Sequence, residues 1–437
     1  MSWSLVNRVP SNHSNLQSSG HESKLAALAF LGQCISYAVT LLLARHLGVE
    51  GFQAYAVASA VFILMAVVAP RGSEKYALRL LPVLIEQGEW ARARGYMLFG
   101  LRRTLLTAMV LGALVGTWAA GVRELPDGTR LAILITLLSL PAGALVHYGL
   151  EVLSAWGHEF TALALFRIAV PGLVLGFVCT LLVSSVQISG AMAIACWGIA
   201  WLLVLLLMAW QITRVMPKGI FDAAPVEELN SWKKAAQPFS IDRLSAGMLA
   251  QPAIIALDWL QPSAAATSAY AAAASTVGLI AVLATATNRT YARQLSLLLE
   301  RREYHTILVL RRKRLHWMLP LIGALLLVSF VFTREALALF GPDFVEEGVA
   351  ALRLLSVTAA FTVLFALAPT YLKYRGRNSA TYISVTCTAV LQVALLFVLV
   401  PRFGASGAAV AYTLSLCGMY AALAWMAHCE LTRLRVP

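Results

Sequence analysis

The chain has 437 residues, of which 59% are hydrophobic and only 13% are charged, and its mean hydropathy is +0.75. Water-soluble domains are closer to half apolar and a quarter charged, so this composition excludes an ordinary soluble domain. Lipid is therefore expected to surround most of the chain.

A helix that crosses a bilayer needs roughly 20 mainly apolar residues. By that measure the sequence predicts twelve spans, at residues 25–43, 51–70, 103–121, 130–150, 160–184, 189–211, 238–260, 264–287, 315–333, 348–370, 380–400 and 405–427. The predicted fold class is an all-α polytopic membrane protein.

The first 23 residues are polar and rich in Ser and Asn, and they lack the basic start and the cleavage site of a signal peptide. We therefore expect a mobile N-terminal tail. The division of the chain that follows is a tail at 1–23, an N-lobe of spans one to six at 24–211, a polar cytosolic linker at 212–236, a C-lobe of spans seven to twelve at 237–428, and a C-terminal tail at 429–437.

The formal net charge of +13 is distributed unevenly along the chain. Basic residues gather in alternate loops: Arg71, Lys75, Arg79, Arg92, Arg94, Arg102 and Arg103 after span two; Arg289, Arg293, Arg301, Arg302, Arg311, Arg312, Lys313 and Arg314 after span eight; and Lys373, Arg375 and Arg377 after span ten. This positive-inside pattern predicts that both termini are cytoplasmic. It favours anionic lipids as neighbours of the basic loops rather than a nucleic acid.

Two segments are nearly repeated half a chain apart, ISGAMAIA at 188–195 and ASGAAVAY at 405–412. Residues 50–64 likewise align with 265–279, with Tyr55 over Tyr270 at an offset of 215 residues (270 − 55). A fixed offset of this kind indicates an internal duplication. Because each half contains six spans, the halves should be parallel repeats that enclose a central cavity, as in transporters that work by alternating access.

Prolines and leucines predict further local features. Pro141, Pro171, Pro252 and Pro369 lie inside spans, where each removes a backbone hydrogen bond and favours a kink or break. Leucines recur at helical spacing among charged residues at 75–90 and 290–308, which predicts two amphipathic helices on the cytoplasmic surface.

The sequence contains neither a Gly-rich phosphate loop followed by Lys nor a His-Glu-x-x-His motif. We therefore expect no enzymatic activity, no cofactor and no metal site.

Several segments resemble the polysaccharide-exporter, or Wzx-type flippase, family of the multidrug/oligosaccharidyl-lipid/polysaccharide (MOP) superfamily. These segments are LARHLGVEGFQAYAVAS in the first hairpin, LFGPDFVEEGVAALRLLSVTAAF, YLKYRGRNS and LVPRFGASGAAVAY. The resemblance implies two six-helix lobes and the flipping of an undecaprenyl-diphosphate-linked oligosaccharide across a bacterial inner membrane, in the synthesis of O-antigen, capsule or exopolysaccharide. It also implies a polysaccharide polymerase or glycosyltransferases as further partners.

A lipid diphosphate needs cations in a hydrated cavity, and arginine binds phosphate oxygens through paired donors. Ionisable residues within spans generally face a cavity or a partner. The predicted headgroup ligands are Arg167, Arg243 and Arg353, with Arg45, Arg79 and Lys373 near span ends as further candidates. The alternative for each is an arginine that reaches the lipid interface or a purely structural ion pair.

Acidic residues near span ends are candidates for coupling to H+ or Na+. They are Asp242, Asp258 and Glu151, together with His147, which lies on the same helix face as Glu151 at i, i+4.

Two other functions fit the sequence. The first is a cation-coupled small-molecule or multidrug antiporter of the same superfamily. The second is a non-transporting membrane scaffold for glycosyltransferases.

Overall fold

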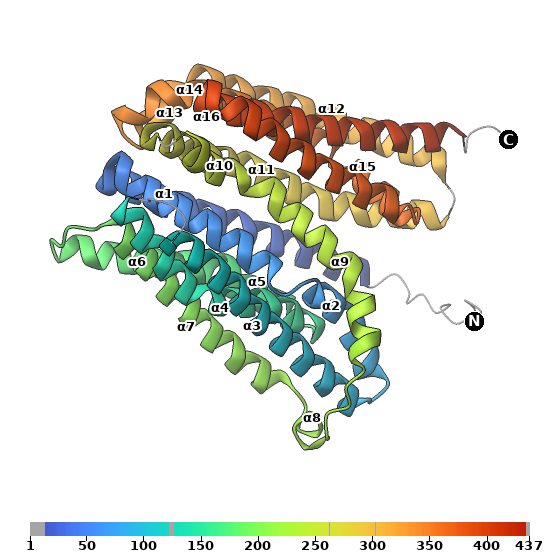
Figure 1. Ribbon diagram of the computed structural model, residues 1–437. Helices are drawn as coiled ribbons and strands as arrows, with labels where there is room; N and C mark the ends of the chain where they lie inside the picture. The colour runs from blue at the N-terminus through green and yellow to red at the C-terminus, as the bar shows by residue number, and fades with distance from the viewer. Residues whose placement is uncertain (1–13, 122–125, 262, 302, 434–437) are drawn as a thin grey trace.

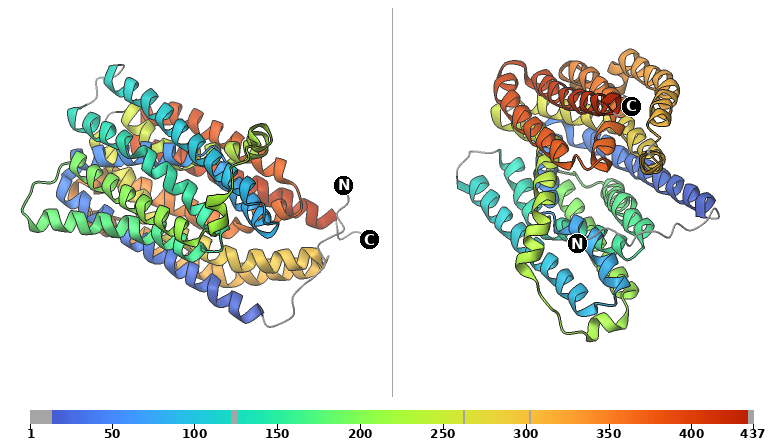
Figure 2. Two further views of the ribbon diagram at one scale, coloured as in Figure 1. Left: turned by 90° about the horizontal axis from the view of Figure 1, so that it is seen from below. Right: turned by 90° about the vertical axis from the view of Figure 1, so that its right-hand side faces the viewer.

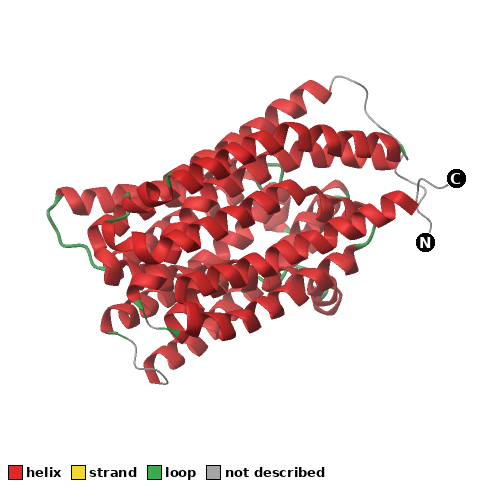
Figure 3. Ribbon diagram, turned by 90° about the horizontal axis from the view of Figure 1, so that it is seen from above, coloured by secondary structure: helices red, strands yellow, loops and turns green. Residues whose placement is uncertain are grey.

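The computed structural model describes residues 14–121, 126–261, 263–301 and 303–433, and their secondary structure is helical throughout, with no strand (Figure 3). The first half comprises α1 (Ser14–Val68), α2 (Ser73–Glu86), α3 (Trp90–Gly121), α4 (Asp127–Ala155), α5 (Glu159–Ala164), the π-helical turn η1 (Leu165–Ala169), α6 (Val170–Val183) and α7 (Gly190–Val215). The second half comprises α8 (Lys218–Asp222), α9 (Leu229–Ala250), α10 (Pro252–Leu260), α11 (Ala264–Glu300), α12 (Tyr304–Val331), α13 (Thr333–Ala338), the 3-10 turn η2 (Pro342–Phe344), α14 (Val345–Phe365), α15 (Leu367–Tyr374) and α16 (Asn378–Arg433).

The helices form two bundles that lie side by side (Figure 1). Helices α1 to α7 make one lobe, α10 to α16 make the other, and α9 packs against both (Figure 2). The first residues of α1 and the last residues of α16 lie at the same end of the molecule, which we call the terminal end; the other is the far end.

Within the described residues, nine continuous helical stretches are long and apolar enough to cross a membrane. A straight helix of 55 residues such as α1 would be about 80 Å long, far more than a bilayer core of about 30 Å. Instead α1 turns at Gly48 (φ 64°) and α16 turns at Gly404 (φ 53°), so each of these helices crosses twice. The α9–α10 pair adds one more crossing, so the chain crosses twelve times, in two lobes of six crossings each. The chain is an all-α polytopic membrane protein, as predicted.

The repeated phrases occupy equivalent places in the two lobes, at the far-end start of each sixth crossing. Ser189 caps α7, and a Cβ on the adjacent Gly190 would lie 2.5 Å from the carbonyl oxygen of Gly51 on α1. In the other lobe a Cβ on Gly407 would strike the carbonyl oxygen of Leu399. The Ser-Gly segment recurs because each lobe has a position where two crossings approach too closely for any residue but glycine.

The lobes contact each other closely at the far end. Phe52 and Tyr37 on α1 make edge-on contacts with Phe344 and Phe340, each with ring centroids 5.7 Å apart. The Ser268 hydroxyl on α11 donates to the carbonyl oxygen of Val49 at 2.7 Å. Aromatic packing and a hydrogen bond from a serine side chain to a backbone carbonyl therefore join the lobes here, beside the α1 turn.

Two of the smaller predictions are confirmed in their secondary structure. The helix predicted at 75–90 corresponds to α2, whose buried residues include Ala77, Leu81 and Leu84, and its place on the cytoplasmic surface stays a prediction. The predicted break at Pro252 separates α9 from α10.

The proline pattern holds only in part elsewhere. The π-helical turn η1 directly precedes the helix that contains Pro171. Helix α4 runs through Pro141 without a break, and the break near Pro369 falls earlier, at Ala366.

The prediction of a second surface helix, at 290–308, is wrong. Helix α11 continues as far as Glu300 and α12 begins at Tyr304. No Gly or Pro interrupts residues 279–300, so the crossing helix extends beyond the apolar segment instead of ending there.

Replacing Gly190 by Leu should destabilise the protein by about 1–3 kcal/mol, because the added side chain forces α7 away from α1. The apparent melting temperature in detergent should fall. Gly418→Leu on α16 is the matched control, since a Cβ there meets nothing within 4 Å. Equal melting temperatures for the two variants would contradict the close packing at Gly190.

Candidate functional site

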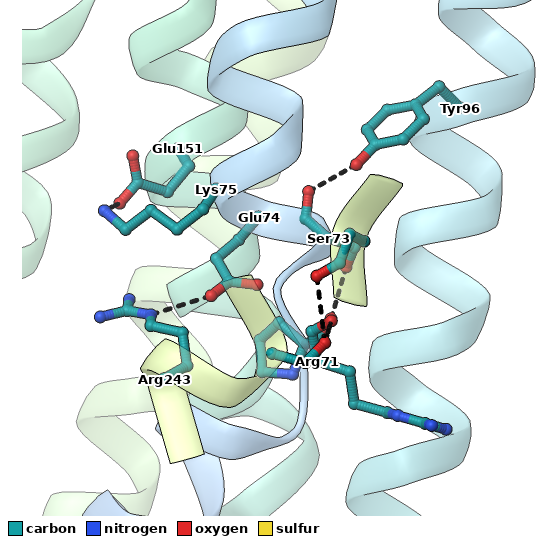
Figure 4. Close-up of polar contacts among 10 residues, drawn as sticks. Arg71, Ser73, Glu74, Lys75, Tyr96, Glu151 and Arg243 are labelled. Atoms are coloured by element: carbon teal, nitrogen blue, oxygen red, sulfur yellow. Dashed lines mark hydrogen bonds and ion pairs between the residues drawn. The ribbon is translucent and has the colours of Figure 1, made fainter. Parts of the chain in front are cut away.

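Two ion pairs lie side by side at the terminal end, where α2 meets α4 and α9 (Figure 4). Lys75 on α2 is paired with Glu151 on α4. Arg243 Nε on α9 donates to Glu74 Oε1 on α2 at 2.9 Å. Neighbouring residues of α2 thus form ion pairs with two different helices, so this short helix links α4 and α9 at the site.

Glu74 is the most enclosed group of the four. Its side chain is 0% exposed, whereas that of Arg243 is 21% exposed. Its second oxygen, Oε2, is buried, and no donor among the described residues reaches it. A buried carboxylate with one oxygen unsatisfied is costly as an anion, and its partner Arg243 offsets that cost.

The turn before α2 sets the direction of these side chains. Arg71 and Gly72 both have positive φ, 51° and 75°. A Cβ on Gly72 would lie 2.5 Å from the backbone nitrogen of Ser240 on α9, so glycine is required there. The Ser240 hydroxyl donates to the carbonyl oxygen of Arg71, and the Tyr96 hydroxyl on α3 donates to that of Ser73 at 2.6 Å. The start of α2 is thus held from two sides.

His147 lies one turn before Glu151 on α4 and is buried between aromatic rings. The ring centroids of Phe166 and Trp201 are 5.0 and 5.8 Å from that of His147. Lys75 is paired with Glu151, one turn from His147 on the same helix, and Arg167 directly follows Phe166, whose ring contacts the imidazole. Two cations of the N-lobe, Lys75 and Arg167, therefore belong to segments beside His147, while Arg243 of α9 is held by Glu74, the neighbour of Lys75.

Arg167 belongs to the π-helical turn η1 and is exposed. Its guanidinium lies over the ring of Phe166, 5.6 Å from the centroid, and its backbone packs against Gly32 of α1. A π-helical turn shifts the helical register by one residue and recurs at functional sites. Here the turn lies at the only candidate arginine of the crossing formed by α5, η1 and α6.

The remaining candidates lie elsewhere. On α14, Arg353 Nε and Nη2 donate to Thr333 and to the carbonyl oxygen of Phe330, at the far end of α12. Arg45 Nε donates to the carbonyl oxygen of Leu339 at 2.5 Å, also at the far end. Neither arginine is part of the group around His147.

Four more candidates have separate positions. Asp258 is buried on α10 and accepts a hydrogen bond of 2.8 Å from Gln53 on α1, so it joins the two lobes. Lys373 lies 5.9 Å from the ring centroid of Tyr382, and Asp242 lies on α9, directly before Arg243. Arg79 is exposed on α2.

The structure thus places two of the predicted residues, Glu151 and Arg167, on segments beside a third, His147, and it places Arg243 in the neighbouring ion pair with Glu74. Sequence reasoning missed Glu74 and treated Lys75 only as a topology signal. The available clue was position: both residues begin α2 directly after a break at Gly72.

A further cavity, of about 400 Å³, lies inside the C-lobe near the terminal end. Its lining is mainly apolar and includes Phe361, Tyr371 and Trp425, with Arg311, Arg314 and His428 as the basic residues. It is separate from the ion pairs, which lie on α2, α4 and α9.

The sequence matches no protein-family profile and no curated protein. The fold matches solved structures. The lipid II flippase MurJ in an inward closed conformation superposes with a TM-score of 0.73 at 13% identity, over 94% of this chain and 89% of that one. An inward-facing multidrug resistance MATE family transporter of the MOP superfamily superposes with a TM-score of 0.65 at 14% identity, over 94% and 95%.

This chain has the MOP transporter fold. A MOP superfamily transporter from Pyrococcus furiosus gives a TM-score of 0.55 at 13% identity, over 95% of this chain and 96% of that one. Identities this low establish the arrangement of the helices, whereas the function has to be argued from the site.

Removing Arg243 alone should be more harmful than removing the whole pair, because Glu74 would be left as a buried, unpaired charge. We expect Arg243→Gln to lower the free energy of unfolding by about 2 kcal/mol, a value reduced by the partial exposure of the arginine. Adding Glu74→Gln should restore most of that loss. The measurement is a double-mutant cycle on thermal unfolding in detergent; additive losses would show that the pair contributes no coupling.

Proposed function

We propose that this protein is a flippase that carries a polyprenyl-diphosphate-linked oligosaccharide across a bacterial inner membrane by alternating access, for the synthesis of a surface polysaccharide. The observation that carries the proposal is the presence of two ion pairs, Arg243 with Glu74 and Lys75 with Glu151, together with the exposed Arg167, in a MOP fold. The Wzx-like segments of the sequence support the same substrate class.

The chemistry of the substrate fits this arrangement. A diphosphate headgroup needs several cations, and it can compete with Glu74 and Glu151 for the side chains that these carboxylates hold. Arg167 is exposed, so an entering anion can reach its guanidinium. The prenyl tail remains in lipid throughout, and the cycle involves no covalent step.

Proton movement has a physical route in the same site. A proton on Glu74 or Glu151 cancels the charge that pairs with Arg243 or Lys75 and frees that cation for the substrate. Glu74 is the better placed of the two, because its Oε2 is buried and no donor in the described part of the chain reaches it. We propose H+ as the coupling ion on this basis, with Asp258 and Asp242 as further acidic groups.

The distribution of charge supports an orientation with both termini in the cytoplasm. The ion pairs and the cationic residues around them lie at the terminal end, where the basic loops also lie. A headgroup made in the cytoplasm would therefore meet the cations first.

The second candidate function is cation-coupled export of small molecules, favoured by the match to MATE transporters and by the buried carboxylate of Asp258. Under this alternative, cells lacking the protein become sensitive to cationic compounds, while surface polysaccharide is unchanged.

Reconstitution in liposomes tests the flippase directly. We expect protein-dependent transfer between leaflets of a fluorescent polyprenyl-diphosphate sugar. Arg167→Gln should slow this transfer at least tenfold, since a charge-assisted contact to phosphate is worth roughly 1.5–3 kcal/mol.

Arg402→Gln is the matched control, because Arg402 is exposed at the far end beside the α16 turn. It should transfer the probe at the wild-type rate. If Arg167→Gln and the wild-type protein flip equally fast, Arg167 has no part in headgroup binding; if no lipid diphosphate is transferred at all, the proposal is wrong.

A further inference from the structure

A second charged feature of the terminal end is a cavity of about 860 Å³ between α3, the turn at Arg71 and the first half of α9. It lies away from the ion pairs, because the Arg71 side chain extends away from Glu74 and Arg243 (Figure 4). Its size is in the range of ligand pockets, roughly 300–1,000 Å³. The transport site described above does not use it.

The lining of this cavity is strongly cationic. It includes five basic residues, Arg71, Arg102, Arg103, Lys233 and Lys234, and one carboxylate, Glu227. Glu227 Oε1 accepts from Arg102 Nη1 at 2.9 Å, and among the described residues of the lining the other four cations have no further carboxylate. Like charges this close repel one another, and an anion placed among them removes the repulsion.

Arg103 gives independent evidence for an anion. Its guanidinium lies over the ring of Phe99, 5.6 Å from the centroid, and its Nη1 is buried. No acceptor among the described residues reaches that nitrogen. A buried donor of this kind generally has a partner, either protein, water or ligand.

The backbone at Arg71 points in the same direction. Its φ of 51° is uncommon for a residue other than glycine, and such strain gathers at binding sites. The strained turn carries the guanidinium to the cavity side of α2, opposite the buried Glu74 (Figure 4).

The cavity lies where lipid headgroups are expected. Immediately beyond Arg102 and Arg103, α3 exposes Leu106 (65%), Met109 (59%) and Val110 (50%). An exposed apolar face that begins one turn after a pair of arginines marks the boundary between water and acyl chains. A headgroup bound at the arginines would leave its chains against this face.

We propose that the cavity binds an anionic lipid headgroup that carries two phosphates. Two phosphate groups offset four excess cations better than the single phosphate of an ordinary phospholipid does. Trp232 fixes the α9 wall, since its ring lies 5.3 Å from that of Tyr96 and 5.6 Å from that of Phe99. The bound lipid joins α3 to α9, the helix that carries Arg243. This inference does not depend on the identity of the transported substrate.

The test is a titration of the purified full-length protein in detergent, with bound lipid counted by native mass spectrometry. The probes are cardiolipin, with two phosphates, phosphatidylglycerol, with one, and inorganic pyrophosphate. Cardiolipin should bind at least about tenfold more tightly than phosphatidylglycerol. Lys233→Gln with Lys234→Gln should weaken cardiolipin binding by about tenfold; both lysines are exposed, so the variant should fold.

The matched control is Arg312→Gln with Lys313→Gln on α12, which removes the same charge from exposed positions outside the cavity. It should bind cardiolipin within about twofold of wild type. Arg103→Gln is the second variant, and it should weaken cardiolipin binding at least as much as the double lysine variant does. The proposed site is overturned if the α12 control loses as much cardiolipin affinity as the lysine pair does, or if cardiolipin binds no more tightly than phosphatidylglycerol. Pyrophosphate binding as tight as cardiolipin binding overturns its assignment to a lipid.

Discussion

Charged side chains inside an apolar helix bundle are stable only where opposite charges or hydrogen-bond donors lie beside them. In this protein that constraint fixes α2. The first two charged residues of α2 pair with different helices: Glu74 with Arg243 on α9, and Lys75 with Glu151 on α4. The position of α2 therefore depends on two ion pairs that an anion or a proton can disturb, and the proposed function follows from that dependence.

The two ends of the molecule are held together by different forces. At the far end aromatic packing and a side-chain hydrogen bond join the lobes, through the contacts of Phe52 with Phe344 and of the Ser268 hydroxyl with the carbonyl oxygen of Val49. At the terminal end the ion pair of Arg243 with Glu74 fastens the connecting helix α9 to the N-lobe. Packing responds little to an anionic ligand, whereas ion pairs respond directly to charge. A headgroup would thus act on one end while the other stays closed.

Much of the fold could be predicted from the sequence because its signals are local. Apolar runs of sufficient length marked the twelve crossings, and the repeated Ser-Gly segment marked a close approach of two crossings in each lobe, at Gly190 and at Gly407. The end of α11 was not predictable from apolar length alone, because a helix without Gly or Pro continues past the apolar segment.

The site was harder to predict than the fold. Arg243 could be identified as a charge inside a span, but its partner Glu74 lies 169 residues earlier in the chain, and only the packing of α2 on α9 brings them together. The same limit applies to Lys75, which reads as one of many basic loop residues until α4 presents Glu151 to it. Conversely, Arg353 is also a charge inside a predicted span, as Arg243 is, yet it lies on α14 and donates to the carbonyl oxygen of Phe330 at the far end of α12. Sequence pattern shows that a charge is unusual, and only the helix arrangement shows what it faces.

The central claim is that an anionic headgroup moves the two lobes relative to each other by acting on the ion pairs at the terminal end. Spin labels at Leu78 on α2 and Tyr374 on α15, both exposed, report the distance between the lobes at that end. With a polyprenyl-diphosphate sugar added to the reconstituted protein, pulsed electron paramagnetic resonance should show a shifted distance distribution. The shift should be absent in the variant that combines Glu74→Gln with Arg243→Gln. Identical distributions with and without the lipid in the otherwise wild-type protein would contradict the account.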